Sequence, residues 1–225
     1  MVQFISIPLK KSINKSYLKV KPFREDFDLF KNKLTHLLSK INKEESEEHN
    51  KNYVRDFLKN TFYGGKEVNT KGRTDLAVHL DKTSKSKVGV IIETKSPANK
   101  TDMISATDLN RKSLHEVILY YFRERIDCKN DEIKNIIVTN ANEWFIFRAE
   151  QFEKLFYKSE LKKEYEKWNN NQKVSSNTDF FYEIIKNFLN KEDFSIEGIH
   201  FNLSDFEKLK EKDEKKLISL YKIFS

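Results

Sequence analysis

The chain has 225 residues, which is enough for one well-packed core with a small helical appendage. Lys and Arg number 42 against 35 Asp and Glu, so the formal charge is +7 and we expect a polyanionic partner such as DNA. The single cysteine, Cys128, excludes an internal disulfide and a cysteine-based zinc site, and no apolar run reaches membrane-spanning length. We therefore expect a soluble protein in a reducing, cytoplasmic compartment.

The N-terminal part is predicted to be an arm followed by a helix. Residues 1–21 are rich in Lys and Ser with isolated apolar residues, which is typical of a loosely docked arm. Apolar residues then recur at helical spacing, namely Phe23, Phe27, Phe30, Leu34, Leu37, Leu38 and Ile41. This stripe predicts a helix that begins near Pro22 and packs on the core.

A second helix is predicted to begin in the acidic segment 44–48 and to continue through Val54 and Leu58. Glu47 lies seven residues before Val54, so it shares a helical face with the apolar stripe. Glu48 is the alternative candidate for the acidic residue on this face of the helix. The glycine turn at 64–65 ends this helix, and a short strand is predicted near residues 66–69.

The most informative stretch is a predicted hairpin. Two strands rich in branched apolar residues, 72–78 and 88–95, are joined by the polar run 82–87. A turn centred near Ser84 and Lys85 would pair residues whose numbers sum to about 169.

This register brings three charged side chains together at one end of the hairpin. Asp75 is expected opposite Thr94, between Glu93 and Lys95. Two carboxylates and an ammonium on a rigid sheet suit a hard divalent cation with oxygen ligands. The alternative is an edge hairpin whose charged end is simply solvated, but an apolar run leads directly into Glu-Thr-Lys.

The remaining elements continue the α/β pattern. Residues 96–100 are predicted to form a loop, followed by a crossover helix that begins near Asp102 or Asp108. Strands are predicted over 132–140 and 143–148, a helix over about 152–165, a polar loop over 169–177, and helices near 180–189, 204–212 and 214–223. His79 and His115 are the two histidines that this order would bring nearest the hairpin end.

At Asp75, Glu93 and Lys95 the chain resembles the PD-(D/E)xK nuclease superfamily, with Thr74 in the place that Pro often occupies. The resemblance implies an α/β fold with a restriction-endonuclease-like core and a mixed sheet of four or five strands. Together with the element pattern, the resemblance predicts a nuclease core over 44–165, between an N-terminal arm and helix over 1–43 and a loop with a C-terminal helical extension over 166–225.

The same resemblance implies a metal-dependent DNA hydrolase. Asp75, Glu93 and Lys95 would be catalytic, and Glu47, Asp75, Glu93 and the Thr94 carbonyl would hold Mg²⁺, with Mn²⁺ able to substitute. Lys95 would orient the attacking water and stabilise negative charge, because an ordinary lysine pKa makes it a poor base. Contacts to DNA are expected from Lys71, Arg73, Asn99 and Lys100.

Residues 44–150 also look like the nuclease region of type IIG restriction-modification enzymes. That likeness implies double-stranded DNA as substrate, fused or associated methyltransferase and target-recognition modules, and transient dimerisation. A non-catalytic DNA-binding or docking module with the same fold is the alternative, and an RNA phosphodiesterase is a third option.

Overall fold

The computed structural model describes residues 2–42, 44, 46–72, 74–207 and 214–225. Within these residues, seven strands form one mixed sheet in the order β1-β7-β6-β5-β4-β3-β2. The strands are β1 (Gln3–Ser6), β2 (Val68–Lys71), β3 (Thr74–His79), β4 (Val88–Thr94), β5 (Asn135–Thr139), β6 (Glu143–Arg148) and β7 (Ser195–Asn202). The α/β fold is as predicted, but the sheet is larger than the four or five strands expected.

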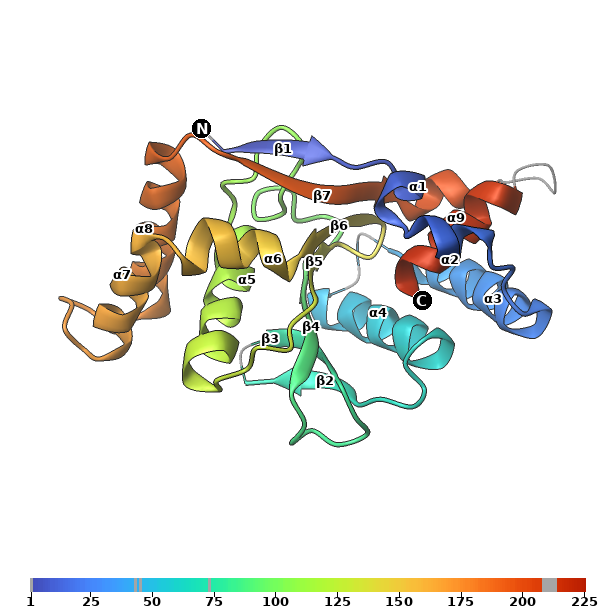
Figure 1. Cartoon of the computed structure of the whole chain (residues 1–225), viewed down its shortest axis with the longest axis horizontal. Helices are drawn as coiled ribbons and strands as arrows, with labels where there is room; N and C mark the ends of the chain where they lie inside the picture. Colours follow the sequence, from blue (N-terminus) through green and yellow to red (C-terminus); the bar gives the residue numbers. More distant parts are fainter. Residues whose placement is uncertain (1, 43, 45, 73, 208–213) are drawn as a thin grey trace.

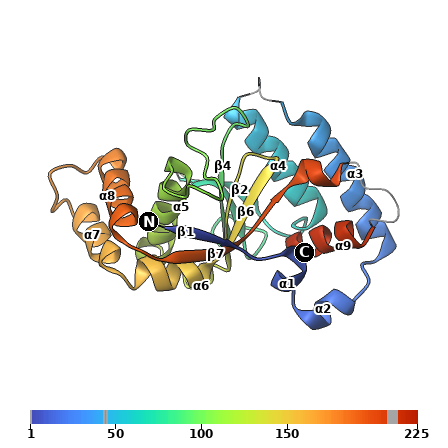
Figure 2. The same cartoon turned by 90° about the horizontal axis from the view of Figure 1, so that it is seen from above.

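Helices cover both faces of this sheet (Figures 1 and 2). On one side lie α5 (Lys112–Phe122), α6 (Ala149–Phe152), α7 (Glu160–Asn169) and α8 (Thr178–Lys191), with π-helical turns at Arg123–Asp127 and Glu153–Tyr157. On the other side lie α1 (Leu9–Ser12), α2 (Lys15–Lys19), α3 (Arg24–Lys40), α4 (Glu47–Thr61) and α9 (Glu214–Phe224). No helix in the described part of the chain is long and apolar enough to cross a membrane.

Two hydrophobic clusters fill the space between the sheet and its helices. Ile91 of β4 packs in the cluster on the α5 side, and its neighbour Ile92 packs in the cluster on the α4 side. Successive side chains of a strand point to opposite faces, so a strand covered on both faces needs apolar residues at every position. This is why β4 reads as the continuous apolar run Val-Gly-Val-Ile-Ile.

The predicted hairpin is present, with a register one residue away from the expected one. β3 and β4 are antiparallel, and Leu76 pairs with Ile92 and Val78 with Val90. The pairing shifts between Val78 and His79, close to the turn. Continued from Leu76, the register places Asp75 level with Glu93 rather than Thr94. The difference arises because the turn is centred nearer the N-terminus than Ser84 and Lys85, and the irregularity near the turn recovers only part of it.

The central crossover follows the predicted order. β4 runs parallel to β5, with Thr94 beside Thr139, and α5 forms the connection between the two strands. β5 and β6 are antiparallel neighbours, as expected. Because β4 and β5 are parallel, their carboxyl ends lie side by side at the same end of the sheet.

The helices predicted from apolar spacing are present as α3, α4, α5, α8 and α9, but α5 begins at Lys112 and not near Asp102 or Asp108. The single helix predicted over about 152–165 is instead formed by α6, a π-helical turn at Glu153–Tyr157 and α7. The helix predicted over 204–212 is seen only as a 3₁₀ turn at Leu203–Phe206, since residues 208–213 lie outside the described residues.

Two strands were not predicted. Residues 1–21 were expected to be a loosely docked arm, yet β1 pairs in parallel with β7, and β7 pairs antiparallel with β6. In β7, Ile196 joins the cluster on the α5 side, whereas Phe201 joins the one on the α4 side. With apolar residues on both faces and Gly198 between them, β7 lacks a simple alternating pattern. The predicted core boundaries, 44–165, thus leave out both β1 and β7.

Gly198 of β7 is closely packed by residues of both neighbouring strands, β1 and β6. A Cβ atom there would lie 2.9 Å from the Phe147 ring and 3.1 Å from the Ile146 carbonyl oxygen. We expect Gly198→Ala to destabilise the protein by about 1–3 kcal/mol through overpacking. Thermal unfolding measures this effect, and Gly65→Ala is the matched control because a Cβ there meets nothing within 4 Å. Equal melting temperatures for the two variants would contradict the prediction.

Candidate active site

Asp75 is held at the start of β3 by the end of β4. Its Oδ2 accepts hydrogen bonds from the Thr94 backbone N–H at 3.0 Å and from the Thr94 hydroxyl at 2.8 Å. Its Oδ1 lies 3.8 Å from the Lys51 ammonium of α4. One carboxylate oxygen is thus fixed to the sheet, and the other is left for an ionic partner.

Lys95 lies in the middle of the site, directly after β4. Its backbone N–H donates to the Thr139 carbonyl oxygen at 2.8 Å, which extends the parallel pairing by one residue. Its ammonium contacts Glu93 Oε1 and lies 2.7 Å from Glu116 Oε2 of α5. All three residues are buried, with exposed fractions of 1% for Glu93, 5% for Lys95 and 8% for Glu116.

The charges of this buried trio do not balance, since one ammonium faces two carboxylates. Burial and the charge of Glu116 raise the pKa of Glu93 well above its ordinary value, although Lys95 acts in the opposite sense. Burial alone would lower the pKa of Lys95, but Glu93 and Glu116 outweigh it and raise that pKa. Lys95 is therefore a permanent cation at neutral pH.

Two carboxylate oxygens of the trio, Glu93 Oε2 and Glu116 Oε2, are buried without a hydrogen-bond partner among the described residues. Glu116 Oε2 has the Lys95 ammonium at ion-pair distance, so Glu93 Oε2 is the one without a charged partner. Glu116 can share a hydrogen bond with Glu93 only when one of the two carboxyls is protonated, which the raised pKa of Glu93 favours. Burying an ionised carboxylate oxygen without a partner destabilises the fold, so a bound cation would stabilise Glu93 Oε2 in its ionised form.

Glu47 approaches the site from the first turn of α4. Ser46 caps this helix by accepting a hydrogen bond from the His49 backbone N–H. Glu47 Oε2 accepts from the Ser96 backbone N–H at 3.3 Å, and its Oε1 lies 3.8 Å from the Lys95 ammonium. The rival Glu48 pairs instead with Lys51 at 2.5 Å. Glu47 is thus the acidic residue of this helix that reaches Lys95.

Two tyrosines lie within electrostatic range of the carboxylates. Burial, followed by the charges of Glu93 and Glu116, raises the pKa of Tyr120. Burial and the same two carboxylates raise the pKa of Tyr182 to about 12. Both phenols keep their protons at neutral pH and can act as neutral hydrogen-bond donors.

Of the four residues expected to contact DNA, two already have side-chain partners in the protein. Lys71 forms an ion pair of 2.5 Å with Glu124, so its ammonium is already engaged. Asn99 is also engaged, because it accepts from the Asp102 backbone N–H and donates to the Asp102 carboxylate. Lys100 is exposed, and Arg73 lies outside the described residues.

The two histidines have partners elsewhere. His79 contacts the Ser86 carbonyl oxygen at 2.8 Å and Asn69 Oδ1 at 3.1 Å, at the turn end of the hairpin. His115 lies next to Glu116 in α5, but its Nε2 contacts Asn110 Oδ1 at 2.7 Å. Burial and Lys186 lower the pKa of His115 to about 4. Neither histidine joins the carboxylates.

Oxygen donors for a metal are present but are not gathered into a ready-made cage. Across the described ranges, no group of three or more His, Cys, Asp and Glu side chains is placed to hold an ion. The Lys95 ammonium instead lies among Glu93, Glu116 and Glu47. The partnerless Glu93 Oε2 and the outward Asp75 Oδ1 fit a hard cation by their chemistry, provided that Lys95 gives way.

Glu116 was missed by reasoning from the sequence. Its only signal is that it is a carboxylate in the apolar stretch Leu114–Phe122, where a helix buried on every side would have to pair it. The partner, Lys95, is 21 residues away in the sequence, and only the packing of α5 on β4 brings the two together.

Comparison with known proteins gives one family. Residues 7–225, nearly the whole chain, match the model described as domain of unknown function (DUF7149). The chain belongs to the DUF7149 family. Searches of curated proteins and of solved structures give no match. The DUF7149 assignment carries no activity with it, so function has to be argued from the site.

The unbalanced trio predicts a pH-dependent gain in stability for a Glu93→Gln variant of this DUF7149 chain. A carboxyl group whose pKa is raised by folding stabilises the folded state fully at pH values below its ordinary pKa of 4.5. This stabilisation is lost as the pH rises through the pKa that the group has in the folded state. Glu93→Gln removes this loss and leaves Lys95 paired with Glu116. We expect the variant to melt about 2 °C or more above the parent at pH 8, with the difference shrinking toward pH 4.

Thermal unfolding in EDTA across this pH range measures the effect. Glu192→Gln, which removes an exposed carboxylate at the end of α8, is the matched control and should show no such trend. A Glu93→Gln variant that is less stable than the parent at pH 8 would contradict the assigned charge imbalance.

Proposed function

We propose that this chain is a Mg²⁺-dependent endonuclease that hydrolyses phosphodiester bonds of double-stranded DNA. The observation that carries the proposal is the gathering of Asp75, Glu93 and Lys95 at one end of the sheet, with Lys95 buried against the carboxylates. A buried, permanent ammonium beside acidic oxygen donors is costly to maintain for stability alone. It is suited to chemistry on a phosphate, where negative charge develops.

Asp75 and Glu93 are the proposed holders of the metal, with Glu47 and the Thr94 carbonyl as further oxygen donors. Asp75 is pre-positioned by its two hydrogen bonds from Thr94. When bound, Mg²⁺ would polarise the phosphate and lower the pKa of a water molecule. Mn²⁺, which also accepts oxygen ligands, is expected to substitute.

Lys95 has a separate role in the proposal. Its raised pKa keeps the ammonium protonated, so it cannot accept a proton from water at neutral pH. It can donate hydrogen bonds to the attacking water and to phosphate oxygens, and it can stabilise the charge that forms on them. Glu116 is a positioning residue that holds this ammonium from α5.

The wider setting follows from charge and resemblance. The net charge of +7 favours attraction to DNA phosphates, and Lys100, an exposed cation five residues after Lys95, is one of the residues expected to contact DNA. We propose a cytoplasmic nuclease domain of a type IIG-like restriction-modification system, acting with methyltransferase and target-recognition modules and able to dimerise transiently.

One observation favours a second function. Because the carboxylates already surround Lys95 and no ready-made metal group exists within the described residues, the chain could serve as a DNA-binding module without catalysis. The two functions differ in a simple assay, since only the first nicks DNA when Mg²⁺ is added. Parallel reactions on RNA separate the DNA nuclease from an RNA phosphodiesterase.

Asp75→Asn and Glu93→Gln are expected to lower Mg²⁺-dependent nicking of plasmid DNA by about 100-fold or more, because each removes a charged metal ligand. Conversion of supercoiled to open-circular plasmid measures the rate. Asp131→Asn is the matched control, as it removes an exposed carboxylate that pairs with Lys87. If either site variant nicks at the parental rate, other residues carry the chemistry.

The isolated chain is also expected to bind DNA weakly, with strong salt dependence and little sequence preference. Phosphate contacts fix position without reading bases, and the proposed target-recognition module is a separate one. Competition between a cognate and a scrambled duplex at physiological salt measures the preference. A preference above about 10³-fold would place target recognition within this chain.

A further inference from the structure

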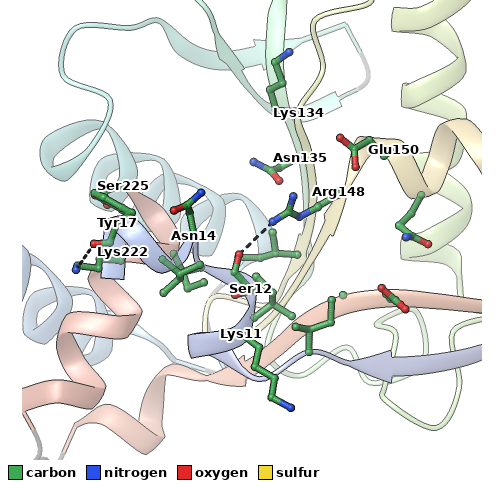
Figure 3. Close-up of a pocket in the computed structure, with 18 residues that line it drawn as sticks. Lys11, Ser12, Asn14, Tyr17, Lys134, Asn135, Arg148, Glu150, Lys222 and Ser225 are labelled. Carbon is green, nitrogen blue, oxygen red and sulfur yellow. Dashed lines mark hydrogen bonds between the residues drawn. The ribbon is translucent and has the colours of Figure 1, made fainter. Parts of the chain in front are cut away.

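A pocket of about 700 Å³ lies at the other end of the sheet from the candidate active site. Its walls come from the start of β5, the end of β6, the middle of β7, the α1–α2 segment and the end of α9 (Figure 3). The pocket exists because the chain that follows β1 passes over these strand ends, and α9 closes the opposite side. Its volume lies within the usual range for small-molecule sites.

This pocket is separate from the carboxylate site. Asn135 lines the pocket at the first residue of β5, whereas Thr139, at the last, pairs with Thr94. Four residue steps along a strand span about 13 Å. A small ligand in the pocket would therefore not contact Asp75 or Glu93.

The lining is positively charged. Four cations, Lys11, Lys134, Arg148 and Lys222, face two carboxylates, Glu150 and Glu197. Among the described residues, no carboxylate lies within ion-pair distance of Arg148 or Lys222, and Lys134 pairs with Glu132 only at 3.7 Å. An anion in this pocket would meet charge that the protein itself leaves uncompensated.

Two of these cations, Lys222 and Arg148, have different roles. The buried Lys222 ammonium donates to the carbonyl oxygens of Tyr17, Leu18 and Val20, so all three of its donors are used to fix α2 as a wall. Arg148 donates through Nη2 to the Ser12 carbonyl oxygen at 3.2 Å. The guanidinium has five N–H donors, so most of them remain available to a ligand.

The neighbours of Arg148 add neutral donors and apolar surface. Figure 3 shows Asn135 beside Arg148, with Glu150 and Asn14 farther away on either side, Lys134 at the top of the view and Lys11 at the bottom. The Asn14 side chain uses its oxygen to cap α2, which leaves its NH₂ group as a donor. The lining also contributes five isoleucines, which lie among polar residues such as Ser12 and Gln151: Ile7, Ile13, Ile146, Ile199 and Ile223.

We propose that this pocket binds a small organic phosphate, in which a phosphomonoester is attached to an apolar or aromatic body. Arg148 takes the phosphate, because a planar guanidinium matches two phosphate oxygens, and the isoleucines pack against the body. The proposal concerns a site distinct from the carboxylates. It does not depend on the nuclease function.

Isothermal titration calorimetry of the full chain in EDTA tests this site, with adenosine 5′-monophosphate as the probe. We expect a dissociation constant of about 1 mM or tighter, and clearly weaker binding of both inorganic phosphate and adenosine. Arg148→Gln should weaken binding of the probe about tenfold or more, since it removes charged hydrogen bonds. Arg55→Gln, on α4, is the matched control.

A second variant keeps the test independent of the contact between Arg148 and Ser12. Asn135→Asp changes one side-chain group, adds a negative charge beside the guanidinium, and should also weaken binding. Glu93→Gln should leave it unchanged, which separates this site from the carboxylates. Three results would overturn the proposal: no binding of the probe, binding that survives both pocket variants, or equally tight binding of phosphate or adenosine alone.

Discussion

The contact of the Lys95 ammonium with Glu93 and Glu116 is the interaction on which the candidate site depends. All three groups are buried, so water cannot screen them, and a single positive charge cannot neutralise two negative ones. Burial and the second carboxylate raise the pKa of Glu93, and Glu93 Oε2 has no hydrogen-bond partner within the part of the chain that the structure describes. A site arranged in this way is stable enough to fold, yet it would gain from a further cation.

The sheet topology explains how these groups meet. The parallel pairing of β4 with β5 requires a long crossover, and α5 in that crossover brings Glu116 onto Lys95. The antiparallel pairing of β3 with β4 brings Asp75 to Thr94. The first turn of α4 adds Glu47 from the other face of the sheet. The local sequence supplies each charge, and the fold supplies the distances between them.

The central hairpin and crossover could be predicted from the sequence because their signals are local. Apolar runs, a polar turn and helical spacing indicated β3, β4 and α5, and the charges at the hairpin end indicated Asp75, Glu93 and Lys95. Glu116 could not be predicted, since its partner is fixed only by tertiary packing. β1 and β7 were missed because a short polar arm and a strand with apolar residues on both faces give no alternating pattern. The expected DNA contact at Lys71 ignored Glu124, which is distant in sequence and pairs with it.

The most direct test of the central claim is anomalous diffraction from crystals of the full chain soaked in Mn²⁺. A cation held by the site should give a peak about 2.0–2.6 Å from carboxylate oxygens of both Asp75 and Glu93, with the Lys95 ammonium moved away from Glu93. The same soak of a Glu93→Gln crystal should lose the peak. A parental crystal in which Lys95 keeps its contact with Glu93 and no peak lies near Asp75 would contradict the claim that these carboxylates form a metal site.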